Sequence, residues 1–503
     1  MVALDRPPEG TVREWLARRA TVGGTAFVFP ETGTEVDWPT LQNDALSFAR
    51  NLTARGAQKG ESIAIVSPNS QEGLVALYGA LAGGFRATMI NLAAGRDAIA
   101  YALDHSGARF AFVHRDCEAL FDAANTSEVT RIASGDHQDT ELHPVGPDDH
   151  ALLMYTSGTT GQPKGVLHSH ASLLAGGWTT AIAHELGASD RGFCILPIYH
   201  INGLCVTIMG ALVSGGSLAV VSRFSASQFW EQASRAKVTW FSAVPTIISH
   251  LLHGDAEPDD ACRERLRFGR SASSALAVET QTAFEKRFSV PIVETMGLTE
   301  TAAQILSNPL PPGVRKIGSP GAGFGCEVEI QGADGSRIED GSEGEIVVRG
   351  PNVMLGYLNN PEATAATFRN GWLRTGDLGR MDEDGYVFVT GRLKELIIKG
   401  GENIAPREVD EALYTHPDVI EAAAFARKSD RYGETVEAAV RVRNGSSITG
   451  TDLRSLCEAR LGIFKTPDAI HFLEELPKGP SGKIQRLKLA DLIAAEASVT
   501  QAD

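Results

Sequence analysis

The chain has 503 residues, of which 43% are hydrophobic and 21% are charged, so it can bury the cores of two or more globular domains. Its formal net charge is −16, and it has no run rich in lysine and arginine, which argues against nucleic acid or an acidic membrane as a partner. The six cysteines show no Cys-x-x-Cys spacing, which argues against zinc, an iron–sulfur cluster and a disulfide framework. The sequence shows no apolar signal core, peroxisomal address or membrane-spanning run, so we expect a cytoplasmic protein.

Short apolar runs alternate with helical patterns over roughly the first half of the chain. Strands are predicted over residues 62–66, 87–90, 109–113, 194–196 and 218–221, and helices over 72–81 and 203–213. Because strands and helices alternate in this order, we expect an α/β fold with layered, largely parallel sheets.

The pattern changes after Gly325 to shorter strands separated by glycine and aspartate turns, which predicts a small β subdomain. A boundary is expected after Thr390. The rest of the chain predicts a compact α+β module with strands over 396–398, 422–425 and 437–442, and helices that begin near 406 and 452.

One glycine-rich segment follows the apolar run 151–154 and predicts a phosphate site. Its candidate phosphate-binding residues are Thr156, Ser157, Gly158, Thr159, Thr160, Gly161, Lys164 and Gly165. Glycines let backbone N–H groups turn toward one anion, hydroxyls add donors, and Lys164 adds a mobile positive charge. The alternative is a flexible linker, but the flanking apolar and amphipathic patterns disfavour it. The usual P-loop spacing is absent, since Pro163 stands where its second glycine should be.

A second segment, residues 294–300, places Glu300 after a short apolar run. Magnesium prefers oxygen ligands and takes few from protein when it also bridges phosphates, so Glu300 is a candidate ligand. Taken alone, a pair such as Thr299 and Glu300 is more often a helix N-cap with a favourable acid in the first turn.

Three further segments carry charged residues beside glycine. Asp377 and Arg392 provide an acid and a base suited to ribose hydroxyls, and Lys483 stands on a turn from which it can reach an anion in another domain. On its own, Lys483 is typical of a solvated loop lysine.

In their order and in their amino-acid sequences these segments resemble the acyl- and aryl-CoA ligase branch of the adenylate-forming superfamily. The resemblance covers nearly the whole chain. It implies an N-terminal ATP- and acid-binding domain over residues 1–390, a hinge over 391–394 and a mobile C-terminal domain over 395–503. It also implies an enzyme that activates a carboxylic acid with ATP and Mg²⁺ to an acyl-adenylate and then transfers the acyl group to CoA. The resemblance is compatible with a homodimer.

The resemblance also implies roles for individual residues. Lys483 would be the adenylation lysine, Lys394 the hinge residue, and Glu300 with Thr156 the magnesium position, with Thr299 at the phosphates. Asp377 and Arg392 would bind ribose. The other positions implied for the nucleotide and CoA are Ser273, Ser274, Ala275, Glu294, Thr295, Met296, Gly400 and Gly401. Many relatives have an aromatic residue at the position of Met296, so here a thioether would contact adenine.

The acid pocket is expected around His200, Asn202, Gly203, Arg270 and Gly297, with His200 also among the catalytic candidates. These residues are unusually polar. The sequence around Arg270 most resembles that of the oxalate-CoA ligase branch. The histidine expected after the Thr-Glu pair in that branch is replaced by Ala302 and Ala303. We therefore expect a short acid with a second anionic group, such as sulfoacetate, malonate or oxalate; a short or medium-chain fatty acid or an aryl acid is the alternative.

Two other classes stay open at this point. A luciferase-like oxygenase would use the same adenylate, and a noncatalytic regulator would keep the fold without the chemistry. The joint presence of Lys483, Glu300, Asp377 and Arg392 argues against the regulator. An amino-acid-activating domain is disfavoured, because the aspartate it needs for the amino group is not found near His200.

Overall fold

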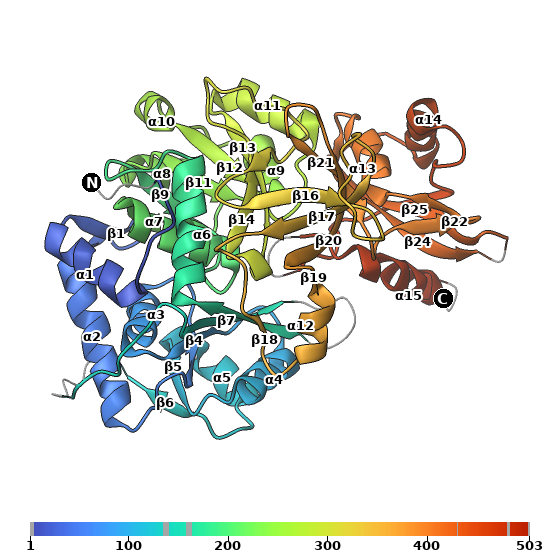
Figure 1. The fold of residues 1–503 in the computed structure, drawn as a ribbon. Coiled ribbons are helices and arrows are strands. Elements are labelled where there is room, and N and C mark those ends of the chain that lie inside the picture. The colour runs from blue at the N-terminus through green and yellow to red at the C-terminus, as the bar shows by residue number, and fades with distance from the viewer. Residues whose placement is uncertain (1–4, 134–139, 157–162, 430, 480–482, 501–503) are drawn as a thin grey trace.

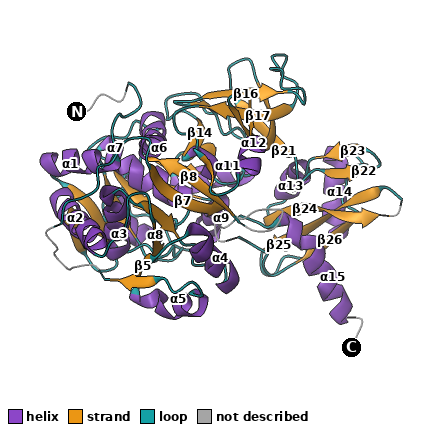
Figure 2. Ribbon diagram, turned by 60° about the horizontal axis from the view of Figure 1, so that its bottom comes forward, coloured by secondary structure: helices purple, strands orange, loops and turns teal. Residues whose placement is uncertain are grey.

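The computed structural model describes residues 5–133, 140–156, 163–429, 431–479 and 483–500. Two large sheets with their helices form the N-terminal part, a smaller β sheet follows, and an α+β unit forms the C-terminal part (Figure 1). In a second view the C-terminal unit lies to one side of the larger part (Figure 2). The expected layered α/β class with a β subdomain and an α+β C-terminal domain is confirmed.

In the described residues, the first large sheet has seven strands. Their order is β18 (Gly356–Tyr357), β8 (Lys164–Ser169), β7 (His150–Thr156), β4 (Arg86–Met89), β3 (Ser62–Val66), β5 (Phe110–Val113) and β6 (Thr130–Ile132). The strands from β7 to β6 run parallel, whereas β8 and β18 are antiparallel to their neighbours. The antiparallel pair brings the two ends of the glycine-rich segment together.

The second large sheet has nine strands within the described part of the chain. Their order is β15 (Ala322–Gly323), β14 (Ala303–Ser307), β13 (Ile292–Leu298), β12 (Phe268–Ser271), β11 (Trp240–Ala243), β9 (Arg191–Cys194), β10 (Ser217–Val220), β1 (Thr25–Phe29) and β2 (Thr34–Asp37). The strands from β13 to β1 are parallel, so their carboxyl ends meet at one edge, where ligands bind in open α/β sheets.

Helices cover both faces of each large sheet. Between the sheets, one apolar core joins both to α1 (Val12–Val22), α2 (Trp38–Ala54), α3 (Gln71–Gly83), α6 (His170–Ala183), a π-helix η2 (Asn202–Met209) and α7 (Gly210–Ser214). The outer face of the seven-stranded sheet packs on α4 (Arg96–Ser106) and α5 (Glu118–Ala124). The outer face of the nine-stranded sheet packs on α8 (Phe229–Arg235), α9 (Pro245–His253), α10 (Asp260–Arg265) and α11 (Val278–Phe288). The helices bury the apolar strands on both sides, as parallel sheets require.

The β subdomain and the C-terminal unit follow in chain order. The former contains β16 (Glu327–Gln331), β17 (Gly344–Arg349), β19 (Phe368–Arg369), β20 (Trp372–Met381), β21 (Val387–Arg392) and α12 (Pro361–Thr367). The latter contains β22 (Ile397–Lys399), β23 (Glu402–Ile404), β24 (Val419–Ser429), β25 (Gly433–Val442), β26 (Ala469–Phe472), α13 (Pro406–Tyr414), α14 (Gly450–Leu461) and α15 (Leu489–Thr500). The C-terminal unit has its own apolar core, and the hinge predicted over 391–394 lies where β21 ends.

One predicted helix differs from the structure. Residues 203–213 were expected to form a single helix, but they divide into η2 and α7. The side chain of Thr207 donates a hydrogen bond to the carbonyl of Gly203 within the wider turn. An apolar run of small residues is compatible with either helix, so the pattern alone does not distinguish a π-helix from an α-helix.

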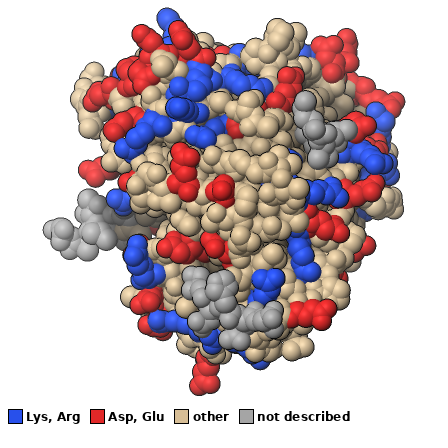
Figure 3. All heavy atoms as spheres, turned by 90° about the vertical axis from the view of Figure 1, so that its left-hand side faces the viewer, with Lys and Arg blue, Asp and Glu red and all other residues tan. Residues whose placement is uncertain are grey.

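Acidic and basic side chains both occur across the face shown in Figure 3. Among the residues that the structure describes, none of the helices combines the length and the apolar character needed to cross a bilayer.

Gly269 on β12 provides a test of the core beneath the site. A Cβ at this position would lie 2.3 Å from Cζ of Phe241 and 2.7 Å from Cδ1 of Ile292. We expect Gly269→Ala to destabilise the protein by about 1–3 kcal/mol, because packed side chains must shift to admit the methyl group. The measurement is the midpoint of urea unfolding. Gly187→Ala is the control, since a Cβ there meets nothing within 4 Å. Equal midpoints for the two variants would contradict the prediction.

Candidate active site

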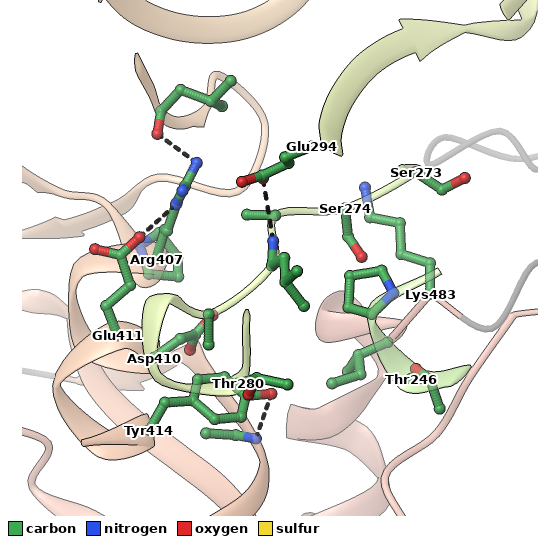
Figure 4. A pocket seen from close by; sticks show the side chains of 18 of the residues that line it. Thr246, Ser273, Ser274, Thr280, Glu294, Arg407, Asp410, Glu411, Tyr414 and Lys483 are labelled. Carbon is green, nitrogen blue, oxygen red and sulfur yellow. Dashed lines mark hydrogen bonds and ion pairs between the residues drawn. The ribbon is translucent and has the colours of Figure 1, made fainter. Parts of the chain in front are cut away.

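A pocket lies between the N-terminal domain and the C-terminal unit (Figure 4). The sequence-predicted residues that line it are Ser273, Ser274, Ala275, Glu294, Thr295, Met296, Gly297, Asp377, Arg392 and Lys483. Figure 4 shows Lys483 on the same side as Ser273 and Ser274, with Arg407 and Glu411 of α13 across the pocket. The fold thus brings together residues that are far apart in the sequence.

One wall is built from β13 and the segment that follows β12. The Oε1 atom of Glu294 accepts a hydrogen bond from the backbone N–H of Leu276 at 3.2 Å. The Thr295 hydroxyl donates to the carbonyl of Ser271 at 3.3 Å. Burial raises the pKa of Glu294 to about 6. Both side chains therefore fasten the 271–276 segment to β13, which is a structural contribution that the sequence did not indicate.

Asp377 and Arg392 form an ion pair at the pocket. They are register partners on the antiparallel strands β20 and β21, and Nε of Arg392 lies 2.7 Å from Oδ1 of Asp377. The neighbouring Asp377 carboxylate raises the pKa of the Arg392 guanidinium. The two groups predicted to bind ribose are thus adjacent, and each fixes the orientation of the other.

Lys483 enters the pocket from the C-terminal unit. Burial lowers the pKa of its amine, and the positive charge of Arg392 adds to this effect. The backbone around it is braced, since the Gly479 N–H donates to the Lys483 carbonyl at 2.7 Å. Arg486, a half-buried residue that the sequence analysis missed, pairs with Asp410 of α13 at 2.6 Å. No local pattern marks Arg486, because its partner lies on a distant helix.

The described phosphate candidates, Thr156, Lys164 and Gly165, lie at the adjoining ends of β7 and β8. Thr156 and Lys164 are register partners, while the candidates Ser157, Gly158, Thr159, Thr160 and Gly161 lie outside the described residues. A Cβ on Gly165 would approach Cδ1 of Leu153 to 2.9 Å, so a larger residue here would displace the Leu153 side chain.

Glu300 lies in the short 3₁₀ turn η3 (Thr299–Thr301), which follows β13. Its Oε1 atom accepts a hydrogen bond from the hydroxyl of Tyr357 at 2.8 Å. Among the described residues, no group of three or more His, Cys, Asp or Glu side chains is arranged to hold a metal ion. A single carboxylate beside the phosphate candidates still fits magnesium, which takes few protein ligands when phosphates supply the others.

Behind the wall lies a buried polar cluster centred on Arg270, whose side chain is 1% exposed. The guanidinium donates from Nη1 to Oδ1 of Asn202 at 2.7 Å and to the Ser242 hydroxyl at 3.0 Å, and from Nε to Oε1 of Gln304 at 3.1 Å. Asn202 also donates to the hydroxyl of Ser273 at 3.3 Å, which connects the cluster to the pocket wall.

The hydrogen-bond partners of Arg270 in the described part of the chain are neutral groups. No carboxylate among the described residues pairs with Arg270, and burial lowers its pKa. Ser242 and Gln304 were missed in the sequence, although Gln304 directly follows the Ala302-Ala303 pair that drew attention there.

The remaining acid-pocket candidates lie close to this cluster in the chain. His200 precedes η2, with its ring centroid 5.1 Å from that of Tyr199. Gly203 and Gly297 are needed for close backbone approach, since a Cβ would lie 2.2 Å from the Pro197 carbonyl oxygen and 1.6 Å from the Ala303 carbonyl oxygen, respectively.

The hinge candidate Lys394 and the candidate glycines Gly400 and Gly401 do not line the pocket. Lys394 follows β21, and Gly400 and Gly401 form the turn between β22 and β23. Both glycines have positive φ angles, 59° and 89°, which favour glycine. The pocket therefore contains Lys483 but not the glycine turn.

Comparison with known proteins gives the family. Residues 13–358 match the AMP-binding enzyme family, and residues 408–483 match the AMP-binding enzyme C-terminal domain. A sulfoacetate–CoA ligase of Cupriavidus necator is 44% identical over 92% of this chain and 93% of that enzyme. An oxalate–CoA ligase of Arabidopsis thaliana is 35% identical over 87% of this chain and 89% of that enzyme.

Solved structures agree with this result. The ATP-bound MatB of Rhodopseudomonas palustris superposes with a TM-score of 0.87 at 28% identity, covering 96% of this chain and 99% of that one. The o-succinylbenzoate–CoA synthetase MenE of Bacillus subtilis, in complex with ATP and magnesium, gives a TM-score of 0.84 at 30% identity, covering 94% and 98%. In sequence and in fold, the chain belongs to the AMP-binding enzyme family.

Proposed function

We propose that this protein is an AMP-forming acid–CoA ligase that activates a small carboxylic acid with ATP and then transfers the acyl group to CoA. The names of the relatives, which include sulfoacetate–CoA and oxalate–CoA ligases, support this function. We further propose magnesium as the metal and, as the substrate, a short acid that carries a second anionic group. The cytoplasmic location, the homodimer and the absence of a nucleic-acid or membrane partner stay predictions of the sequence.

Activation through an adenylate explains why the pocket needs several cations. A carboxylate resists attack by a thiol, because its carbon is electron-rich and oxide is a poor leaving group, whereas AMP leaves readily. The first step joins the carboxylate to the α-phosphate of ATP, so the protein must offset repulsion between two anions and hold them in line. Lys483 and Lys164 would supply positive charge on the phosphate side. Magnesium held by Glu300 and Thr156 would add further positive charge at the phosphate oxygens.

The nucleotide roles follow from the pocket walls. Asp377 would accept hydrogen bonds from ribose hydroxyls, with Arg392 fixing its carboxylate. The 273–275 segment and Met296 would contact adenine, and Thr299 would contact phosphate. His200 would stand near the reacting carboxylate.

The arrangement supports the first half-reaction. Lys483 lines the pocket, whereas Gly400 and Gly401 do not. We propose that rotation about Lys394 exchanges Lys483 for the glycine turn and admits the pantetheine arm of CoA, so that one C-terminal domain serves both half-reactions in turn.

The proposal of a second anionic group on the substrate rests on the burial of Arg270. Burying a guanidinium without a carboxylate costs several kcal/mol in effective free energy, only part of which neutral hydrogen bonds offset. An anionic ligand beside the cluster would offset the rest. Asn202, which contacts both Arg270 and Ser273, would connect the second anionic group to the nucleotide pocket. A monocarboxylic acid would leave the guanidinium uncompensated, which disfavours the fatty-acid alternative.

The role of Lys483 is tested by separating the half-reactions. We expect Lys483→Ala to lower acid-dependent ATP–pyrophosphate exchange by on the order of 100-fold, because a well-placed electrostatic donor is lost. Thioester formation from supplied acyl-adenylate should be largely retained. Lys488→Ala, at an exposed lysine nearby, is the control. Equal loss of both half-reactions in Lys483→Ala would rule out the assignment.

The proposed second anionic group of the substrate is tested by placing a carboxylate of the protein itself beside Arg270. In Gln304→Glu a carboxylate replaces the amide that lies 3.1 Å from Nε of Arg270, and should compete with the substrate. We expect kcat/KM for sulfoacetate, malonate or oxalate to fall by about 10-fold or more, with little change for acetate and butyrate.

The control for this variant is Gln232→Glu, at a buried glutamine of α8 whose amide contacts Gln228. It should leave the preference between the two groups of acids unchanged. Two outcomes would contradict the proposed second anionic group without contradicting the ligase reaction. One is a wild-type enzyme that prefers butyrate, and the other is a Gln304→Glu variant whose kcat/KM falls equally for both groups of acids.

A further inference from the structure

Tyr357 contacts two of the charged residues assigned to the phosphate side. Its ring centroid lies 4.7 Å from Nζ of Lys164, and its hydroxyl donates a hydrogen bond to Oε1 of Glu300 at 2.8 Å. The residue is 8% exposed. One buried side chain therefore holds a cation through its ring face and a carboxylate through its hydroxyl.

The backbone fixes where this ring lies. Tyr357 is the register partner of Val166 on β8, and the N–H of Leu358 donates to the Gly165 carbonyl at 2.8 Å. The N–H of Tyr357 itself donates to the Thr364 hydroxyl at 2.9 Å. The ring is thus fixed to the strand that begins at Lys164.

The turn η3, which carries Glu300, is held by the segment that precedes Tyr357 and by β8. The N–H of Met354 donates to the Glu300 carbonyl at 2.8 Å, and the Asn352 amide donates to the Thr301 carbonyl at 2.8 Å. Nε2 of His168, on β8, lies 2.7 Å from the Thr299 carbonyl oxygen. With the backbone of η3 held in this way, the hydrogen bond from the Tyr357 hydroxyl orients the Glu300 carboxylate.

This placement keeps opposite charges apart. In the described residues no ion pair joins Lys164 to Glu300, although both contact Tyr357. A direct pair would neutralise the ammonium and occupy the carboxylate, so neither would be available to a polyphosphate or to a metal ion. An aromatic ring attracts the cation without carrying a negative charge of its own.

We propose that Tyr357 is a positioning residue for the phosphate site, which aims Glu300 at the metal and holds Lys164 ready for phosphate while preventing the two from pairing. This inference rests on the proposed function. It assigns separate tasks to the two parts of one side chain: the hydroxyl acts on metal-dependent binding, and the ring acts on binding of the phosphates themselves.

The test measures ATP binding by calorimetry in EDTA and in Mg²⁺. In Tyr357→Phe the ring stays and the hydroxyl is lost. The gain in ATP affinity on adding Mg²⁺ should therefore fall by about 10-fold, while affinity in EDTA is unchanged. In Tyr357→Leu the ring is lost as well, so affinity in EDTA should also fall, by about 3-fold. A merely structural role would lower both affinities together in Tyr357→Phe.

The chain offers a matched control at Tyr386. Its ring centroid lies 4.6 Å from Nζ of Lys316, and its hydroxyl donates to the Val314 carbonyl at 2.6 Å, outside the pocket. Tyr386→Phe and Tyr386→Leu lose the same kinds of contact and should bind ATP like the wild type. Glu300→Gln gives the reference for loss of the metal response.

The outcomes separate this inference from the proposed function. A full Mg²⁺ response in Tyr357→Phe, together with its loss in Glu300→Gln, would overturn the role of Tyr357 and leave the metal position intact. A wild-type protein whose ATP affinity does not respond to Mg²⁺ would overturn the metal position and this inference with it.

Discussion

Repulsion between anions is the constraint on which the arrangement of this pocket depends. The chain carries a net charge of −16, and the proposed reaction brings a carboxylate to a polyphosphate. Positive charge must therefore be concentrated locally. It comes from separate places in the fold: Lys164 on β8, Arg270 on β12, Arg392 on β21, and Lys483 in the C-terminal unit.

The partners of these cations differ, and the difference has a chemical consequence. Lys164 lies over a ring and Arg270 is held by neutral amides and a hydroxyl, so both keep their charge for a ligand. Arg392 is paired with Asp377, which balances its charge and serves orientation instead. The position of each cation in the fold thus matches the task proposed for it: attraction where an anion must bind, alignment where a neutral sugar must bind.

The C-terminal unit combines an internal ion pair beside Lys483 with a polar contact to the N-terminal domain. Within the unit, Arg486, three residues after Lys483, pairs with Asp410 of α13. Across the boundary, Arg407 of α13 donates to the carbonyls of Val389 at 2.6 Å and Gly318 at 3.3 Å. Each such hydrogen bond contributes about 0.5–1.5 kcal/mol net, so a few of them can be exchanged in a domain rotation. An interface built from such exchangeable contacts suits a domain that must deliver Lys483 and withdraw it again.

The sequence predicted much of the fold and of the pocket, and its failures have physical reasons. Alternating strand and helix patterns located β3, α3 and the β subdomain, since burial imposes a period that can be read locally. Motifs placed Asp377, Arg392 and Lys483 in one site. Contacts between distant segments produce no local sequence pattern, so the roles of Tyr357, Gln304 and Arg486 were not predicted. The backbone at the pocket and behind its wall also departs from local rules, with φ values of +76° at Ser273 in the lining and of +43° at Ala302 and +80° at Ala303 behind it. Side chains other than glycine seldom adopt such angles, and structures that retain them cluster at functional sites. Ala303 lies against Gly297, where a Cβ would come within 1.6 Å of the Ala303 carbonyl oxygen, and the next residue, Gln304, accepts a hydrogen bond from Arg270.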